Sequence, residues 1–211
     1  MLIIGTTAIN FTRDTGTFHC PNCEAHTEYR RRIARQFLTL YFVPLIPLKQ
    51  VGEFVECRAC KNSFRPDVID MSPEQIREAA EIAFFENAYR IMVLIMIADG
   101  TVDEEELETI RRLVAEFTNE ETTVDDIVEQ AKAAAHALDR GYDAVRYSRE
   151  ASGQWSDEQK ESVIRMCFLV ATASGELMPS QNNQLQRMRF ALKIDEERFR
   201  QIIERASQEQ I

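Results

Sequence analysis

The pattern of apolar and polar positions changes character near residue 70. Before that point, short runs rich in β-branched and aromatic residues alternate with turn residues, which is typical of strands. The longest run, 37–48 (FLTLYFVPLIPL), holds two prolines, which predict a strand interrupted by a bend. A capping box with proline at the first helical position follows at 72–75 (SPEQ) and marks a helix start. We therefore expect a β-rich domain over 1–70 and a helical domain over 71–211.

Regular start and stop signals divide the helical domain. Capping residues or prolines stand at the predicted helix starts, and glycines follow several of the predicted helix ends. The segments with helical periodicity are 73–98, 103–117, 124–138, 142–152, 156–173, 179–192 and 195–206. The sequence therefore predicts an all-α domain built from several amphipathic helices.

The helical domain also contains an internal repeat. Residues 90–100 (RIMVLIMIADG) align with residues 165–175 (RMCFLVATASG), and the apolar positions that follow continue to match. The matched apolar pairs are Ile110 with Leu185, Leu113 with Met188, and Phe117 with Leu192. The expected fold class is therefore α+β and multidomain, with a small β-rich module followed by an all-α domain of two related helical hairpins.

The composition is that of an ordinary folded chain. Of 211 residues, 45% are hydrophobic, and the chain has only 7 glycines and 6 prolines. No apolar stretch reaches the roughly 18–20 residues of a membrane span. The first residues lack the basic start and apolar core of a signal peptide. We therefore expect a cytoplasmic protein with no membrane span.

Charge is distributed unevenly along the chain. Residues 1–70 hold nine Lys or Arg against seven Asp or Glu, which leaves 16 against 28 for the remaining residues. Nucleic acid is an unlikely partner for such an acidic helical domain, because phosphate contacts supply most non-specific affinity. The one basic run that could contact phosphates lies in the first part of the chain and contains Arg30, Arg31, Arg32 and Arg35.

Four of the five cysteines form two C-x₂-C pairs, Cys20 with Cys23 and Cys57 with Cys60. Two such turns supply the four thiolates that a closed, tetrahedral structural zinc site requires. A disulfide pair needs an oxidising compartment, and a thioredoxin-like centre needs a βαβ unit that the pattern lacks. Iron in a rubredoxin-like site uses the same ligands and stays an alternative. We expect structural zinc at these four cysteines.

Two histidines and the fifth cysteine are also of residue types that can bind a metal. His19 and His26 flank the first cysteine pair, but the ligand set is complete without them. Cys167 lies in an apolar helical run and is expected in the core. None of the three is expected to bind the metal.

The N-terminal pattern resembles the zinc-ribbon 15 family. The resemblance covers about residues 1–66 and rests on 3–6 (IIGT), 18–23 (FHCPNC), 37–48 and 54–60 (FVECRAC). It implies a small β-rich zinc module and no reaction.

An acidic turn follows the first apolar helix of the helical domain. In 98–106 (ADGTVDEEE), the carboxylates Asp99, Asp103 and Glu106 surround a glycine turn, as a hard cation requires. An EF-hand alignment fails, because isoleucines then occupy two of the positions that need carboxylates. Helix capping explains Asp103 and Glu106 and leaves only Asp99 without a structural role. We therefore favour the capping interpretation.

The helical domain resembles the tellurite-resistance TerB family over about residues 74–206. The matched features are Ala98-Asp-Gly100, the turn that ends at Glu106, and a second copy at Ala173-Ser-Gly-Glu176. The resemblance implies two adjacent acidic turns that bind a divalent metal. In the second turn, however, Ser174, Met178 and Gln181 stand where the first turn has Asp99, Asp103 and Glu106.

Only Glu176 remains as a carboxylate in the second turn. Asp99, Asp103, Glu106 and Glu176 are therefore expected to bind calcium or magnesium weakly or not at all.

The chain lacks the common catalytic signatures. It has no phosphate-binding glycine loop, no H-E-x-x-H and no G-x-S-x-G. We therefore expect a non-enzymatic, metal-binding adaptor or interaction protein with structural zinc and a protein partner, and the TerB resemblance implies a stress-response role. The alternatives are a nucleic-acid-associated zinc ribbon that uses the arginine run, and an iron-binding redox protein.

Overall fold

The computed structural model describes residues 4–40, 43–118 and 121–209. The chain divides into two compact units, Met1–Ala80 and Glu81–Ile211. The division lies within the first long helix, and each unit is described by itself below.

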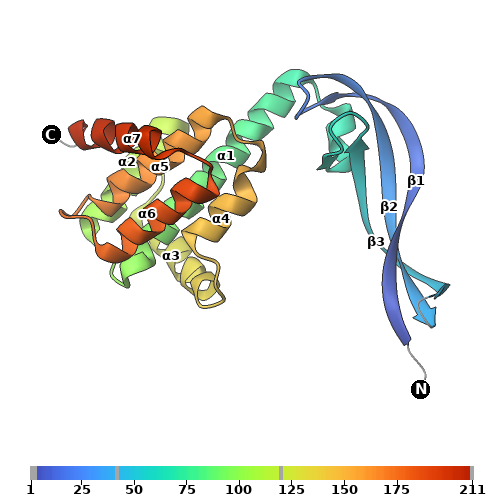
Figure 1. Cartoon of the computed structure of the whole chain (residues 1–211), viewed down its shortest axis with the longest axis horizontal. Coiled ribbons are helices and arrows are strands. Elements are labelled where there is room, and N and C mark those ends of the chain that lie inside the picture. The colour runs from blue at the N-terminus through green and yellow to red at the C-terminus, as the bar shows by residue number, and fades with distance from the viewer. Residues whose placement is uncertain (1–3, 41–42, 119–120, 210–211) are drawn as a thin grey trace. The chain divides into compact units, whose positions relative to one another are not determined.

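The first unit is a four-stranded antiparallel sheet with the strand order β1-β2-β3-β4 (Figure 1). Its elements are β1 Ile4–Cys20, β2 Ala25–Leu40, β3 Val43–Cys57, β4 Ser63–Phe64 and the 3₁₀ helix η1 Pro66–Asp70. The apolar cluster of this unit lies around the two cysteine turns and contains Phe18, Cys20, Val55, Cys57, Val68 and Ile76. A β-rich N-terminal module is thereby confirmed.

The apolar run 37–48 corrects one expectation. It forms the end of β2 and the start of β3, which pair antiparallel with Leu38 opposite Ile46. The run therefore belongs to two separate antiparallel strands, and the expected single strand with a bend is wrong; residues 41 and 42 lie outside the described parts. Both prolines lie inside β3, whose only other partner, β4, pairs with Val55 and Glu56. Proline is tolerated in such an edge segment because its missing N–H has no ladder bond to make.

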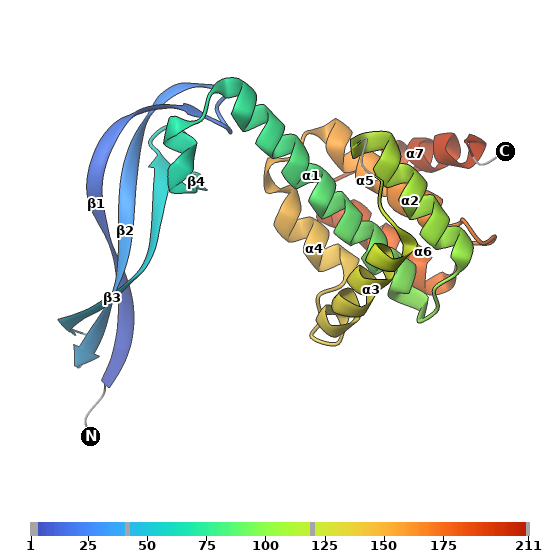
Figure 2. The same cartoon turned by 180° about the vertical axis from the view of Figure 1, so that it is seen from behind.

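The second unit is all-α, as expected (Figures 1 and 2). Its helices lie within a few residues of the segments that the periodicity predicts. They are α1 Pro73–Met96, α2 Glu104–Thr118, α3 Val124–Leu138, α4 Ala144–Ala151, α5 Asp157–Ala171, α6 Pro179–Ala191 and α7 Glu196–Gln208, with the 3₁₀ turns η2 Ile97–Asp99 and η3 Ser152–Gln154. In the part of the chain that the structure describes, none of the helices has the length and apolarity to span a membrane.

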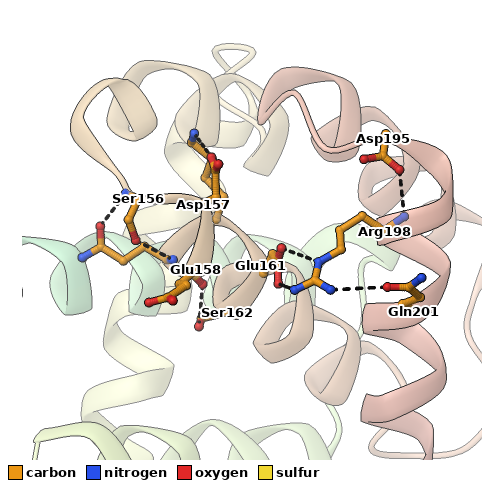
Figure 3. A network of polar contacts seen from close by, with 10 residues as sticks. Ser156, Asp157, Glu158, Glu161, Ser162, Asp195, Arg198 and Gln201 are labelled. Carbon is orange, nitrogen blue, oxygen red and sulfur yellow. Dashed lines mark hydrogen bonds and ion pairs between the residues drawn. The ribbon is translucent and has the colours of Figure 1, made fainter.

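Local capping explains where these helices begin. Ser156 caps α5: its Oγ accepts the N–H of Gln159, whose side chain accepts the N–H of Ser156 (Figure 3). Asp195 caps α7 by accepting the N–H of Arg198 at 2.9 Å. The Arg198 guanidinium also donates twice to Glu161, at 2.5 Å each, and so ties α7 to α5 (Figure 3). Each cap satisfies a backbone donor that has no partner inside the helix.

The core of the helical unit reproduces the internal repeat. The repeat-matched residues Ile110 and Leu185 are 0% and 1% exposed, and both belong to the same apolar cluster. The central helix α5 contacts α2, α6 and α7. The two hairpins therefore share one core.

Candidate metal centre

Two equivalent turns hold the four cysteines. Cys20 ends β1 and Cys57 ends β3, and each is followed by a turn that contains the second cysteine of its pair. In the first turn the N–H of Glu24 donates to the Cys20 carbonyl at 2.9 Å, and in the second the N–H of Lys61 donates to the Cys57 carbonyl at 3.0 Å. The two donors have left-handed backbones, with φ of 50° and 64°. The two cysteine pairs therefore adopt the same turn.

The four sulfur atoms gather in one group. All four Sγ atoms lie within 4.8 Å of one another, with Cys20 to Cys60 at 3.8 Å and Cys23 to Cys57 at 4.0 Å. A tetrahedral zinc site with Zn–S bonds of about 2.3 Å has S···S edges of about 3.8 Å. The separations are far longer than the roughly 2.0 Å of a disulfide bond. The donor set and its spacing therefore fit a tetrahedral thiolate-bound metal ion.

The environment of the thiols differs within the group. Burial raises the pKa of Cys20 to about 12. Burial also opposes ionisation of Cys57, but a hydrogen bond from Thr27 and backbone hydrogen bonds from Cys60 and Ala59 outweigh it and lower its pKa to about 6. The Thr27 Oγ1 lies 3.3 Å from the Cys57 Sγ. Cys57 is therefore prepared to be a thiolate, and a bound cation stabilises the ionised form of the other thiols.

His19, His26 and Cys167 are not members of the sulfur group. His19 pairs with His26 across the first hairpin, and their ring centroids are 5.5 Å apart. Cys167 is fully buried in α5, and burial raises its pKa. Among the described residues, the four-cysteine group is the only gathering of three or more His, Cys, Asp or Glu side chains with metal-binding geometry.

The basic run lies on the central strand β2 rather than on a turn. Arg31 donates to Glu53 at 2.5 Å, and Arg32 to Glu56 at 3.2 Å, both on the neighbouring strand β3. These carboxylates offset two of the four positive charges of the run. Arg31 and Arg32 are therefore not free to neutralise phosphates, which a patch built from the whole run would require.

Two carboxylates of the first acidic turn, Asp99 and Glu106, accept hydrogen bonds within the protein. The Asp99 Oδ1 accepts from both the N–H and the Oγ1 of Thr101, each at 2.9 Å. The buried Glu106 accepts the N–H of Asp103 at 3.3 Å with one oxygen. Asp99, which helix capping did not explain, therefore closes the glycine turn.

The other Glu106 oxygen makes a contact that sequence reasoning missed. It accepts from the Gln181 Nε2 at 2.9 Å, and these two residues occupy equivalent positions of the repeat. Glu106 is 2% exposed and Gln181 1% exposed. Burial raises the pKa of Glu106 to about 7, and the nearby Asp99 and Asp103 act in the same direction. The repeat alignment is the signal that could have found this pair.

Few carboxylate oxygens of the acidic turns converge without another partner. Glu176 is exposed, Gln181 offers an amide in place of a carboxylate, and the oxygens of Glu106 already accept two hydrogen bonds. Calcium takes about six to eight oxygen ligands. One hydrogen bond, from Gln181 to Glu106, therefore joins the two turns.

Comparison with known proteins assigns both units. The family model described as "Tellurite resistance protein TerB" matches residues 86–204, and a zinc-ribbon family model matches residues 18–82. No curated protein and no solved structure matches the chain. Because the TerB match covers more than half of the 211 residues, and because the four cysteines gather in the zinc-ribbon segment, the chain belongs to the TerB family and carries a zinc ribbon before its TerB domain.

Proposed function

We propose that the four cysteines hold one structural zinc ion. The observation that carries this proposal is the sulfur group itself, with Sγ atoms within 4.8 Å of one another and two contacts near the edge length of a zinc tetrahedron. Four thiolates leave no open position for water, so the metal organises the fold and performs no reaction. The apolar cluster beside it is small, and metal binding supplies much of the folding free energy of such a module.

Elemental analysis of the purified full chain tests this proposal. We expect about one zinc per chain, a colourless protein, and loss of the metal in Cys57→Ser. The matched control is Cys167→Ala, which removes a buried cysteine outside the sulfur group and should keep full occupancy. Red protein containing iron would support the redox alternative, and full zinc occupancy in Cys57→Ser would contradict the ligand assignment.

The protein as a whole acts, on this proposal, as a non-enzymatic interaction protein. The closed thiolate set offers no site for substrate, and both oxygens of the buried Glu106 accept hydrogen bonds, from the Asp103 N–H and from Gln181. The TerB relationship supports a role in a cytoplasmic stress response, with a protein partner for the helical unit. The paired Arg31 and Arg32 do not support nucleic acid as the partner.

A survival assay tests the stress role. Cells that lack the gene should survive tellurite less well than wild-type cells, and the full chain supplied from a plasmid should restore survival. The Cys57→Ser chain shows whether the metal module takes part. Equal survival with and without the gene would contradict the role in tellurite stress.

A further inference from the structure

The part of the sheet farthest from the cysteine turns carries exposed apolar side chains. We define the distal sheet as residues 4–12, 33–40 and 43–52, which are the start of β1, the end of β2 and the start of β3 (Figure 1). The apolar cluster of this unit is built from residues outside the distal sheet. Six large apolar side chains of the distal sheet are between 45% and 56% exposed: Phe11, Val43, Leu45, Ile46, Leu48 and Val51.

These side chains cover both faces of the sheet. Phe11 contacts Phe37 on one face, with ring centroids 5.9 Å apart. Ile46 is the pairing partner of Leu38, the next residue of β2, and therefore lies on the opposite face. Residues 43–51 of β3 are exposed without interruption. A partner protein usually docks on one face of a sheet, whereas the interfacial layer of a membrane contacts both faces of an inserted element at once.

The distal sheet has two edges, β1 and β3, and the β3 edge is unsuited to strand addition. The distal part of β3 holds Pro44 and Pro47, and β4 pairs only with Val55 and Glu56. Each proline removes a backbone N–H that an added strand would need. The same missing donors lower the cost of placing the β3 edge in an apolar medium, where an unpaired N–H is unfavourable, whereas the β1 edge keeps its donors and is expected to stay at the hydrated level of the interface.

The charge of the distal sheet indicates the kind of surface it fits. Its sequence contains two cations, Arg35 and Lys49, and no aspartate or glutamate, in a chain whose net charge is −10. Both cations are exposed. Apolar side chains accompanied by Lys or Arg are the combination that binds anionic lipid surfaces. Two cations are few for binding a polyanion through charge alone, so the apolar side chains must supply part of the affinity.

We propose that the distal sheet is a peripheral membrane-binding element that inserts its apolar side chains into the interface of an anionic lipid bilayer. Leu45, Ile46 and Leu48 enter the acyl boundary, while Arg35 and Lys49 contact lipid phosphates or carboxylates. The proposal goes beyond the zinc and stress roles and depends on neither.

Sedimentation with lipid vesicles tests the proposal on the full, metal-loaded chain. We expect binding to vesicles of phosphatidylcholine with roughly one quarter phosphatidylserine, and much weaker binding to pure phosphatidylcholine. Added salt should weaken the binding to anionic vesicles without abolishing it, because part of the affinity comes from apolar burial.

Variants separate the apolar and the charged contributions. Leu45→Ser with Ile46→Ser should weaken binding about tenfold or more, because each side chain loses the area it would bury. Arg35→Gln and Lys49→Gln should each weaken it about fivefold. Phe190→Ser, which removes a side chain that is 69% exposed in α6, is the matched apolar control and should bind normally. All variants alter exposed residues, and zinc content with circular dichroism checks their folding.

A tryptophan probe reports insertion directly. Ile46→Trp should show a blue-shifted emission and protection from a water-soluble quencher on anionic vesicles, whereas Phe190→Trp should show neither. Three results would overturn the proposal: no binding of the wild-type chain to anionic vesicles, equal binding to neutral ones, or unchanged binding of the Leu45→Ser/Ile46→Ser chain. A wild-type dimer that this double variant dissociates would overturn it too, because a second copy would then cover the distal sheet.

Discussion

Thr27 contacts the sulfur group from outside the four cysteines. Its Oγ1 lies 3.3 Å from the Cys57 Sγ, and the resulting hydrogen bond favours the thiolate. Partners of this kind orient a ligand and adjust how strongly it binds the metal. The residue gives no signal in the sequence, because a threonine four residues after a C-x₂-C pair is ordinary in a strand.

We predict that Thr27→Val lowers zinc affinity about 10- to 100-fold while the four ligands stay in place. The change keeps the shape of the side chain and removes only the hydroxyl. Competition with a chromogenic chelator measures the affinity. Thr15→Val, at an exposed position of β1, is the matched control and should bind zinc like the wild type. An unchanged affinity in Thr27→Val would show that this hydrogen bond does not act on the metal.

Glu106 is a second residue whose pKa depends on its surroundings in the fold. Burial raises its pKa from 4.5 to about 7 in the folded chain, so the folded state holds this proton more tightly than the unfolded state. The protonated form therefore contributes stability that is present below about pH 4.5 and is lost as the pH rises through about 7.

We predict that Glu106→Gln removes this contribution to the pH dependence. Between about pH 5 and pH 8, the unfolding free energy of the variant should rise relative to wild type by about 1–3 kcal/mol. Urea unfolding at a series of pH values measures the difference. Glu105→Gln changes an exposed carboxylate of the same helical turn and should follow the wild-type profile. Parallel profiles for Glu106→Gln and wild type would contradict the prediction.

At the scale of single elements, the helix boundaries follow from local chemistry. The capping boxes at Thr123 and Ser156 begin α3 and α5 at the residues that the sequence indicates. Gly100 adopts a φ of 87° and ends the turn after α1, a conformation that an L-residue rarely adopts. Strand boundaries were less predictable, because the run 37–48 contains no glycine or asparagine that would indicate a hairpin.

We predict that Ser156→Ala destabilises the helical unit by about 1 kcal/mol, because it leaves the Gln159 N–H without its side-chain acceptor. Ser162→Ala is the control in the same helix. Ser162 donates to the Glu158 carbonyl from inside α5, and its loss should change stability by less than about 0.5 kcal/mol. Figure 3 shows both serines, and thermal melting of the two variants compares their stabilities. Equal losses in the two variants would contradict the stabilising role of the Ser156 cap.

The contact between the two repeat turns leads to a further prediction. The Gln181 side chain donates a hydrogen bond to Glu106. In Gln181→Glu, two carboxylates would face each other at this buried position, so the variant should be less stable than the wild type at neutral pH. Calcium should restore part of that stability, because it can bind between two carboxylates. Calcium should not change the stability of the wild-type chain. Melting temperatures with and without calcium provide the measurement, and a micromolar calcium dissociation constant for the wild type would contradict our interpretation.

At the scale of the whole molecule, the two units have separate sources of stability. The helical unit has one continuous apolar cluster, and the sheet unit has a small cluster beside the sulfur group. We predict that a fragment of residues 72–211, which keeps α1 whole, folds cooperatively and melts at the same temperature with and without a chelator. In the full chain, the chelator should remove only the sheet transition. An unfolded fragment would contradict the independence of the two units.

The sequence by itself determined the features that depend on neighbouring residues. Helix starts follow from caps that act over three residues, and the ligand identity follows from C-x₂-C pairs whose turn places both thiols on one side. The 75-residue repeat, seen in the match of Ile110 with Leu185, also predicted one shared core of two hairpins.

Only the tertiary structure decided what depends on register and on distant contacts. The pairing of Leu38 with Ile46 placed apolar side chains on both faces of the distal sheet, and the pairing of β2 with β3 neutralised Arg31 and Arg32. The fold likewise brought Glu106 to Gln181, which are 75 residues apart. Such contacts arise because packing joins segments with no local signal for one another, so their charge, exposure and hydrogen bonding follow from the assembled fold.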